Sequence, residues 1–545
     1  MSQGLDIRLR PKLEINNSLA VSNVHNLEIA VKKGPISLLG KGNSPSSYST
    51  TGIAYTLYPN SLNTFVDRDI PLTIAFNCTV NGIGGASGNI LDFGVFSSLR
   101  SYCLHRIMQT FTLGINGTSE TYQPNYAIPA LERYAESDEF LRTNSSITPT
   151  RPDVMQEYAM AYNGNSNQIG VVQDCLNNYG NTDKLQGGGR GQFGPGISIS
   201  NVVGNSPGVA TPGTVTFVLT LNESLIHPFL KAFSPNNTSL VGIRQMDFNI
   251  TFVPNIFQAL WSQSGYVDAG TITSSFVSNV LPAAPIFSIT QYDVNPEVWS
   301  IPRKAIYTYN KMVIQSQGVG DLAPGATTTV LYNSFQIGTE LDSIYLFARE
   351  NDANTTVTST NTFPAINNVN VTYNNVNSIL SSENQLMLWK LHNKNGGLMS
   401  YNEWTFFTGG VLRLDFTKDI PIADNSAPGL STNKNINITM QITNINSTRT
   451  VNYVAWIIFV YKGILAIDTV DGTANAYTTT LTKEDVLAVG FDVDNAEVSS
   501  KSHGWFGSGL NPRRFVPYSS VMQGNGPSKL FGGKAISKYE LQRRY

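Results

Sequence analysis

The chain has 545 residues, which is enough for two or more domains with substantial hydrophobic cores. Charged residues make up only 14% of it, against roughly 25% in an average soluble domain. The formal net charge of -2 argues against a globally basic nucleic-acid-binding protein. Asn, Gly, Ser, Thr and Pro are abundant, and this composition suits strands and turns better than helices, so we predict an all-β protein.

The N-terminal segment, residues 1–50, is predicted to hold an arm and the first strands. Its opening letters, MSQGLDIRLRPKLEI, have no apolar stretch behind the charges, so we expect no secretory signal. The three cysteines, Cys78, Cys103 and Cys175, are odd in number and lack C-x-x-C spacing. They predict neither a disulfide framework nor a zinc ribbon, and they favour synthesis in a reducing compartment.

The first well-defined strand is TFTLGINGT, residues 110–118. Its alternation places Phe111, Leu113 and Ile115 on one face and polar or small residues on the other. The same pattern returns 258 positions later in NVNVTYNNV. That offset aligns the three apolar residues with Val369, Val371 and Tyr373.

Each of these strands precedes a predicted short helix, at residues 128–136 and, with the same offset of 258, at residues 386–394. The first helix carries Pro129 early, where a missing N–H group is tolerated. The second has end signals that favour a helix: Ser382 as N-cap with Gln385 as its reciprocal partner, Lys390 and Lys394 near the C-terminal end, and Gly396 as the stop.

Two later stretches repeat with smaller offsets. Residues 214–230 match 410–425 with an offset of 196, and FNITF at 248–252 matches INITM at 436–440 with an offset of 188. Because the offset shrinks along the chain, the first copy must contain extra residues.

Most of the extra length is predicted at residues 138–213, where Gly, Asn, Ser and Pro dominate. This composition favours a long surface loop. A smaller excursion is predicted at residues 264–285. The copies then end alike, with closing strands at 286–294 and 457–465.

The run VAWIIFVYKGIL, residues 454–465, is shorter than the roughly 20 residues of a membrane helix, and its aromatic and β-branched content favours a buried strand. Two units of many short strands, one short helix and long loops fit a β-sandwich or jelly-roll architecture, whereas a propeller needs at least four shorter repeats. The predicted divisions are an arm with the first strands at 1–50, a first unit at 51–295 with the insertion at 138–213, a second unit at 296–466, and a tail at 467–545.

The tail differs from the rest of the chain in charge. From Lys501 onward, eight basic residues and Glu540 alone give about +7, so the remainder carries about -9. The stretch HGWFGSGLNPRRFVPYSS mixes aromatic residues with arginines. That mixture suits contact with nucleic acid, a membrane surface or another protein, and the alternative is a solvated or subunit-contacting arm. The candidate inner-surface or partner contacts are Arg513, Arg514, Lys529, Lys534, Lys538, Arg543 and Arg544.

Catalytic and metal-binding motifs find little support. The five histidines, at 25, 105, 227, 392 and 503, have no close metal-ligand spacing, so structural or surface roles are predicted for them. GKGNS at 40–44 and GGGRG at 187–191 lack the ending of a phosphate-binding loop, and DVDNAE at 492–497 lacks the Gly and final Glu of an EF-hand. There is no G-x-S-x-G nucleophile motif, and nothing favours a carboxylate pair for glycoside hydrolysis. We predict no catalytic residue, cofactor or metal, and no enzymatic activity.

Longer motifs carry a family resemblance. In the second copy they are SFQIGTELDSIYLFAREND, FPAINNVNVTYNNVNSILSSENQLMLWKLHNKNG, YNEW and GGVLRLDFTKDIPIADNSAPG, in that order. The first copy has NESLIHPFL followed by LVGIRQMDFNITF. These motifs resemble double jelly-roll major capsid proteins, with the greatest likeness to those of Polinton-like viruses and virophages, over roughly residues 65–465.

The resemblance implies two tandem jelly-roll β-sandwiches with short helices and long loops. It also implies a homotrimer that forms a pseudo-hexagonal capsomer, or hexon, and capsomers that tile an icosahedral shell around double-stranded DNA. The implied partners are neighbouring capsomers, penton and minor capsid proteins, and genome DNA or an internal membrane in weak contact with the tail. The implied location is the virion, after synthesis in the host cytoplasm or nucleus.

The duplication itself is consistent with this reading, since two similar units in each of three chains give a threefold assembly six similar sectors. The alternative is a β-sandwich carbohydrate-binding or attachment protein, and an enzyme of jelly-roll fold is a distant third.

Overall fold

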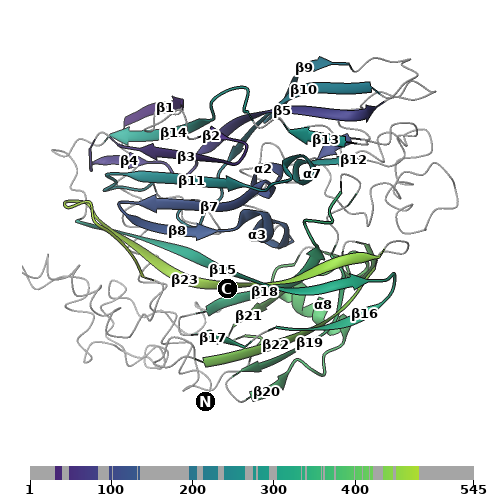
Figure 1. Ribbon diagram of the computed structural model, residues 1–545. Coiled ribbons are helices and arrows are strands. Elements are labelled where there is room, and N and C mark those ends of the chain that lie inside the picture. The colour runs from purple at the N-terminus through teal and green to yellow at the C-terminus, as the bar shows by residue number, and fades with distance from the viewer. Residues whose placement is uncertain are drawn as a thin grey trace, which may run out of the picture. The chain divides into compact units, whose positions relative to one another are not determined.

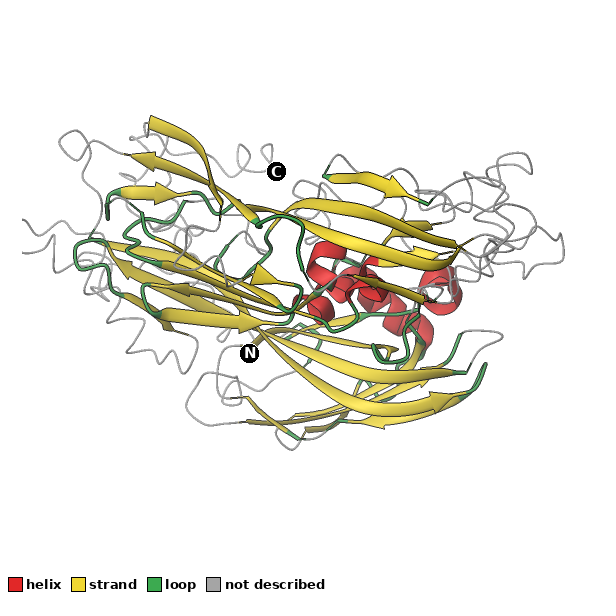
Figure 2. Cartoon of the chain, turned by 45° about the horizontal axis from the view of Figure 1, so that its top comes forward, coloured by secondary structure: helices red, strands yellow, loops and turns green. Residues whose placement is uncertain are grey.

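The structure is a computed structural model, and all the residues that it describes belong to one compact unit within Met1–Thr480. The described residues are 31–39, 48–59, 61–83, 97–100, 102–131, 133–134, 196–204, 213–230, 239–263, 274–277, 280–293, 303–332, 334–337, 341–356, 359, 363–373, 376–397, 399–407, 409–416, 418–420, 434–445 and 450–477. Strands dominate the structure, while the helices gather in one region (Figure 2).

The first half of the chain forms two antiparallel sheets (Figure 1). One sheet has the order β1 (Val31–Leu39), β14 (Ile286–Asp293), β5 (Pro71–Ile83), β10 (Gly213–Ser224) and β9 (Ile197–Val203), with β4 (Thr64–Val66) beside β14 and β13 (Ser274–Val277) beside β5. The other has the order β2 (Tyr48–Ser49), β3 (Gly52–Leu57), β11 (Met246–Phe252), β7 (Met108–Ile115) and β8 (Thr118–Tyr122). The other described elements of this half are a small strand pair, β6 (Ser97–Leu99) and β12 (Trp261–Gln263), and the helices α2 (Cys103–Arg106), α3 (Pro124–Leu131) and α7 (Ile256–Leu260).

The second half repeats the arrangement. One sheet has the order β15 (Lys304–Leu322), β23 (Val451–Asp468), β18 (Leu341–Glu350) and β21 (Leu412–Asp415), with β24 (Ala474–Tyr477) beside β23. The other has the order β16 (Thr327–Leu331), β22 (Lys434–Thr443), β19 (Ala365–Tyr373) and β20 (Val376–Ile379), with β17 (Phe335–Ile337) beside β22. Its described helices are α8 (Gln385–Lys394) and the π-helical turn η3 (Glu403–Phe407).

The two halves share one topology. With eight main strands numbered along each half, one sheet has the order first, eighth, third, sixth, and the other has the order second, seventh, fourth, fifth. This is the two-sheet, eight-strand jelly roll. The predicted double jelly roll is confirmed, and the fourth strands, β7 and β19, are the pair that the offset of 258 identified. We call the halves the first roll and the second roll.

One predicted offset is wrong by two residues. Ile115 pairs with Met246 in the first roll, and its equivalent Tyr373 pairs with Ile436 in the second. If the offset of 258 holds for the fourth strands, Met246 of β11 is equivalent to Ile436 of β22. The offset between these two strands is therefore 190 rather than 188. Because strand side chains alternate with a period of two, the error left every side chain on its correct face.

The strand predicted at residues 110–118 ends earlier than expected. β7 stops at Ile115, and Asn116 and Gly117, both with positive φ (51° and 88°), form the tight turn into β8. Asn-Gly is the dipeptide that favours a two-residue hairpin turn, because both residues tolerate the left-handed region. The predicted facing is confirmed, since Phe111, Leu113 and Ile115 are all fully buried.

The first predicted helix was misplaced. α3 spans Pro124–Leu131 instead of 128–136, so Pro124 occupies its first position and Pro129 lies inside it. A proline inside a helix leaves the carbonyl four residues earlier without its N–H donor. Here that carbonyl belongs to Asn125, and it accepts a hydrogen bond of 2.7 Å from Nη1 of Arg349 instead.

The second predicted helix is confirmed as α8, but its N-cap is wrong. Asn384 caps it, and the Asn384 side chain accepts from the backbone N–H of Met387 at 3.0 Å. The predicted stop is correct, because Gly396 follows the last turn with a φ of 88°. Both α3 and α8 follow the fifth main strand of their roll.

Several other expectations fall partly outside the described residues. Within the predicted loop at 138–213, β9 forms a largely exposed edge strand next to β10, and most of the remainder lies outside the described residues. Of the segment 264–285, residues 274–277 form β13. Pairing in the second roll continues through β24, beyond residue 467, where the tail was expected to begin.

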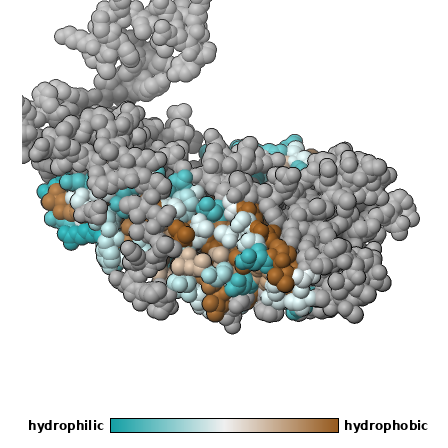
Figure 3. Space-filling model, turned by 90° about the horizontal axis from the view of Figure 1, so that it is seen from above, coloured by the Kyte–Doolittle hydropathy of each residue, from teal (hydrophilic) through white to brown (hydrophobic). Residues whose placement is uncertain are grey.

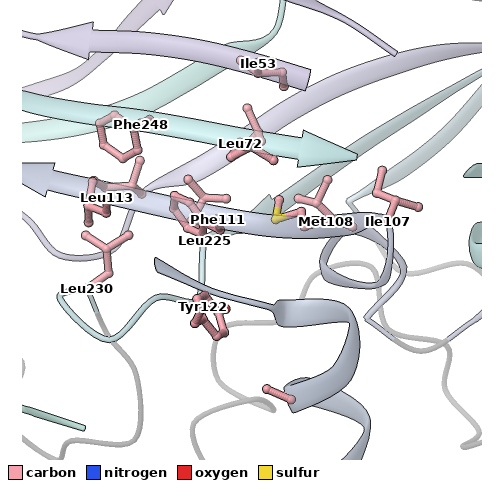
Figure 4. Close-up of a cluster of buried hydrophobic side chains, with 14 of the residues drawn as sticks. Ile53, Leu72, Ile107, Met108, Phe111, Leu113, Tyr122, Leu225, Leu230 and Phe248 are labelled. Atoms are coloured by element: carbon pink, nitrogen blue, oxygen red, sulfur yellow. The ribbon is translucent and has the colours of Figure 1, made fainter. Parts of the chain in front are cut away.

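Each roll has an apolar core between its sheets. Figure 4 shows Phe111 and Leu113 of β7, Phe248 of β11 and Leu72 of β5 in the core of the first roll. The core of the second roll holds equivalents such as Val371 of β19. Among the described helices, none is long and apolar enough to cross a membrane.

Candidate functional site: the seam between the rolls

The seven basic residues predicted to make inner-surface contacts lie outside the described residues. So do the segments 40–44, 187–191 and 492–497 and the histidines at 25 and 503. In the part of the chain that the structure describes, no three His, Cys, Asp or Glu side chains form a group that could hold a metal ion. The most extensive set of unusual buried groups lies where the rolls meet, and we call this contact the seam.

The seam is built on one sheet of the second roll that is buried on both faces. Along β18, Ile344 and Leu346 belong to the core of the second roll, whereas the alternate residues Tyr345 and Phe347 belong to the core of the first. β23 divides its residues in the same way, with Ile457 facing one core and Ile458 the other. A strand with two buried faces needs apolar residues at successive positions. The run at 454–465, predicted to be a buried strand, is confirmed as part of β23.

A polar network crosses the seam around Tyr134. Its hydroxyl donates to the carbonyl of Val411 at 2.9 Å and accepts from the backbone N–H of Arg413 at 2.5 Å. Nδ1 of His392 lies 3.1 Å from the same carbonyl, so this nitrogen carries the proton. Burial lowers the pKa of His392 to about 4, which keeps the ring neutral. Gly397 packs against this ring so closely that an added Cβ would lie 2.1 Å from Nε2.

A second network joins β15 to the first roll. The Tyr307 hydroxyl accepts from the backbone N–H of Val241 at 3.0 Å and donates to the carbonyl of Ser239 at 3.1 Å. The guanidinium of Arg68 lies 5.9 Å from the centre of the Tyr307 ring, and burial lowers the pKa of Arg68 to about 10. These contacts fix β15 against the first roll through a fully hydrogen-bonded phenol.

Arg100 ties the first roll to the loop after β18. It is only 2% exposed, and it donates to the carbonyls of Gln258 at 2.9 Å, Ser359 at 2.8 Å and Thr356 at 2.9 Å. Hydrogen bonds from a charged donor are stronger than neutral ones, especially where water is excluded. Arg100 therefore holds the backbone carbonyls of Thr356 and Ser359 against the first roll.

Arg349 makes the corresponding link from the second roll. Besides the carbonyl of Asn125, it binds the carboxylate of Asp352, and its guanidinium lies 5.2 Å from the centre of the Tyr126 ring. Tyr126 in turn stacks on Trp456 of β23, with 4.0 Å between ring centroids. Beside these residues lies a pocket of about 290 Å³, lined by both rolls.

Two further buried histidines serve the first roll alone. His105 Nδ1 lies 3.1 Å from the Glu223 carboxylate, and its Nε2 accepts from the backbone N–H of Ile226 at 3.0 Å. His227 accepts from the backbone N–H of Phe229, and burial lowers its pKa to about 3. Each ring satisfies backbone or carboxylate groups, which agrees with the structural roles predicted for the histidines.

The seam residues were not identified from the sequence. Tyr134, Arg100 and Arg349 act on partners more than 200 positions away, and no local pattern marks such partners. The only sequence signal was the apolar run at 454–465, whose lack of alternation could have indicated a sheet buried on both faces.

Comparison with known proteins agrees with this architecture. Residues 12–291 match the family described as Sputnik virophage major capsid protein 1st domain, and residues 309–408 match the major capsid protein V20 C-terminal domain. Capsid protein V20 of Sputnik virophage is 26% identical over 509 residues, which cover 88% of this chain and 80% of that protein.

Two solved structures share the fold. A chain in the cryo-electron microscopy structure of the Sputnik virophage superposes with a TM-score of 0.68 at 23% identity, covering 95% of both chains. The crystal structure of the mavirus major capsid protein superposes with a TM-score of 0.63 at 12% identity, covering 83% of this chain and 92% of that one. Because the first family match alone spans just over half of the sequence, the chain belongs to the Sputnik-type virophage major capsid proteins, and it is a viral major capsid protein of the virion.

Proposed function

We propose that this capsid protein forms a homotrimer with a pseudo-hexagonal outline, and that such capsomers tile an icosahedral shell around double-stranded DNA. The observation that carries the proposal is the identical strand order of the two rolls. Three chains related by closed threefold symmetry then present six similar sectors, so the trimer packs in a sixfold lattice position. The rigid seam supports this arrangement, because it holds both rolls of a chain as one building block.

The surface also supports an assembled state. Figure 3 shows brown apolar residues interspersed with teal polar ones on the face seen from above. Two of the exposed large apolar residues, Val202 and Val203, lie on β9, which is the terminal strand of its sheet among the described residues. The exposed large apolar residues of the described chain are Tyr58, Val202, Val203, Val280, Leu331, Leu386, Met387, Phe406 and Val470.

The basic tail extends the proposal to other partners. Its charge of about +7 from residue 501 onward favours an inner position, with weak contact to genome DNA or an internal membrane. The other proposed partners are neighbouring capsomers and the penton and minor capsid proteins. The proposal keeps the predicted divisions at 1–50, 51–295, 296–466 and 467–545, except that β24 extends the second roll to Tyr477. It assigns the protein a structural role without catalysis.

The first test is the solution mass of the purified full chain by light scattering, followed by electron microscopy of the same fraction. The proposal expects three times the chain mass and particles with a hexagonal outline. A monomer that persists at high concentration would refute it and would favour an attachment protein instead.

A second arm of the experiment addresses the tail. Deleting residues 501–545 should leave the trimer intact but reduce retention of double-stranded DNA, and the difference should shrink as salt rises. Equal retention by both proteins at low salt would remove the tail from the proposal.

A further inference from the structure

The helices α3 and α8 hold equivalent places in the two rolls but differ in burial. Seven of the eight residues of α3 are buried, whereas α8 buries only Leu388 and His392 of its ten residues. In the first turn of α8, Leu386 and Met387 are 42% and 45% exposed. Apolar side chains of a helix normally gather on its covered side, so this exposed pair indicates a second side of α8 that a partner covers.

The second roll covers α3 (Figure 1). The ring of Tyr126 on α3 stacks on Trp456 of β23, with 4.0 Å between centroids, and its centre lies 5.2 Å from the guanidinium of Arg349 of β18. Just after α3, Tyr134 packs edge to face with Tyr345 of β18, with 5.3 Å between centroids. Thus α3 is buried against the sheet of β15, β23, β18 and β21, on the face turned away from the core of the second roll.

The equivalent face of the first roll lies on β14, β5 and β10. Along these strands, buried side chains alternate with half-buried or exposed ones, which lie on the side away from the core. We call this side the open face. No described residue of the open face on these three strands is charged, and the centres of interfaces are depleted in charged residues. Its central residues are Thr73, Ala75, Asn77, Thr79, Thr216, Val218, Thr220, Ile286, Ser288 and Thr290.

We propose that the first turn of α8 packs on the open face of a second copy of the chain, so that the contact between copies repeats the seam within each copy. The partner is a second copy because its first roll presents the face equivalent to the one that covers α3. Each copy offers α8 to one neighbour and receives α8 from the other, which closes a ring of three. The inference rests on the trimer proposed above and names the surfaces that hold that trimer together.

The chemistry of the two surfaces agrees. Leu386, Met387, Lys390 and Asn393 are all exposed and are spaced by three or four positions, so they form one stripe along α8. The threonine and alanine side chains of the open face present methyl groups to the two apolar residues. Their hydroxyl groups accept hydrogen bonds from Lys390 and Asn393, and Lys390 meets no like charge on these three strands.

The first test is the solution mass of the purified full chain, measured by light scattering over a range of concentrations. The natural chain should have three times the chain mass. The double variant Leu386→Asp, Met387→Asp places two charges against the open face, and it should raise the dissociation constant of the trimer by at least about tenfold. Its circular dichroism spectrum should match that of the natural chain, because both side chains are exposed within one copy and aspartate suits the first turn of a helix.

The matched control is Leu331→Asp. Leu331 is 65% exposed and lies on β16, at the opposite end of its sheet from β20, which precedes α8. This variant should keep the mass of the natural chain. If the double variant is as trimeric as the natural chain, or if Leu331→Asp dissociates the trimer equally, the inference is wrong and the trimer itself stands. A monomeric natural chain would overturn both.

Crosslinking tests the partner surface. Met387→Cys and Val218→Cys, each in a chain that also carries Cys175→Ser, are co-expressed and treated with a short bis-maleimide, while the natural Cys78 and Cys103 are buried. We expect a covalent dimer only when both variants are present, because α8 of one copy meets the open face of another. No dimer from the pair, or an equal yield from either variant alone, would place α8 against a different surface and overturn the proposal.

Discussion

The third main strand occupies the same place in both rolls, yet its two copies differ in burial. In β5 of the first roll, buried residues such as Leu72, Ile74 and Phe76 alternate with half-buried ones. In β18 of the second roll, all six residues from Ser343 to Ala348 are buried. The same topology thus gives a sheet with one buried face in the first roll and a sheet buried on both faces in the second.

This difference teaches why the repeat was visible in only part of the sequence. β7 and β19 each have one buried face and alternate in the same way, so an offset of 258 aligned them. β5 and β18 hold equivalent positions but meet different surroundings, so their patterns diverge. The burial pattern of a strand therefore depends on what packs against its two faces as well as on its position in the topology.

The largest expected effect tests the second buried face of β18. Phe347→Ala removes a fully buried ring that packs edge to face with Phe363, with 5.7 Å between centroids. We expect a loss of about 3–5 kcal/mol in the free energy of unfolding, because the cavity cannot close between two rigid rolls. Urea denaturation followed by tryptophan fluorescence measures it.

The matched control is Thr79→Ala, on the half-buried face of β5. Its expected cost is within about 0.5 kcal/mol. Similar losses for the two variants would show that the sheets do not differ as proposed.

The next-largest predicted effect is a loss of stability at low pH, which His392 at the seam should cause. Burial lowers its pKa from 6.5 to about 4 in the folded protein, so the unfolded chain binds a proton first as the pH falls. The contribution of His392 to the free energy of unfolding is fully present above pH 6.5 and is lost at up to about 1.4 kcal/mol per pH unit as the pH falls to 4. Below pH 4 the loss levels off, at a total of about 3 kcal/mol. Unfolding free energies measured across this range test the trend.

His392→Asn keeps a donor near the position of Nδ1 and removes the titration. The variant should lose stability less steeply than the natural chain between pH 6.5 and pH 4. Some pH dependence should remain because His227, inside the first roll, has a pKa lowered to about 3. Parallel curves for the two proteins would exclude His392 as a source of acid sensitivity.

A smaller effect compares a phenol across the seam with one inside a roll. Tyr134→Phe removes a donor to Val411 and leaves the buried N–H of Arg413 without its acceptor, at a cost of about 1–3 kcal/mol. Tyr122→Phe removes only the bond to the carbonyl of Ile226 within the first roll, and about 1 kcal/mol is expected. A larger loss in the free energy of unfolding for Tyr122→Phe than for Tyr134→Phe would contradict the prediction that the hydrogen bonds across the seam contribute more to stability.

The smallest predicted effect concerns how the helices α3 and α8 begin. α3 begins with Pro124, whereas α8 depends on the side chain of Asn384 as its cap. Asn384→Ala should cost about 1 kcal/mol in thermal or chemical unfolding. Ser382→Ala should have almost no effect, and a greater loss for Ser382→Ala would restore the cap predicted from the sequence.

The sequence by itself determined the features that depend on neighbouring residues. The alternation of Phe111, Leu113 and Ile115, the body of α8 and the closing strands were all predicted, because side-chain periodicity and helix-end chemistry act within a few residues. The repeat of these local patterns, together with the family resemblance, was enough to predict two jelly rolls. The N-cap predicted at Ser382 was wrong, because Asn384 caps the helix instead.

Only the tertiary structure decided how the two rolls meet. Arg100 reaches Ser359, and Tyr134 reaches Val411, across separations of 259 and 277 positions. Such contacts depend on the packing of whole sheets. The types of the two residues do not indicate that they meet in the fold, because they lie so far apart in the sequence. The same holds for Pro129, whose place inside a helix is acceptable because Arg349 of the other roll satisfies the carbonyl that the proline leaves free.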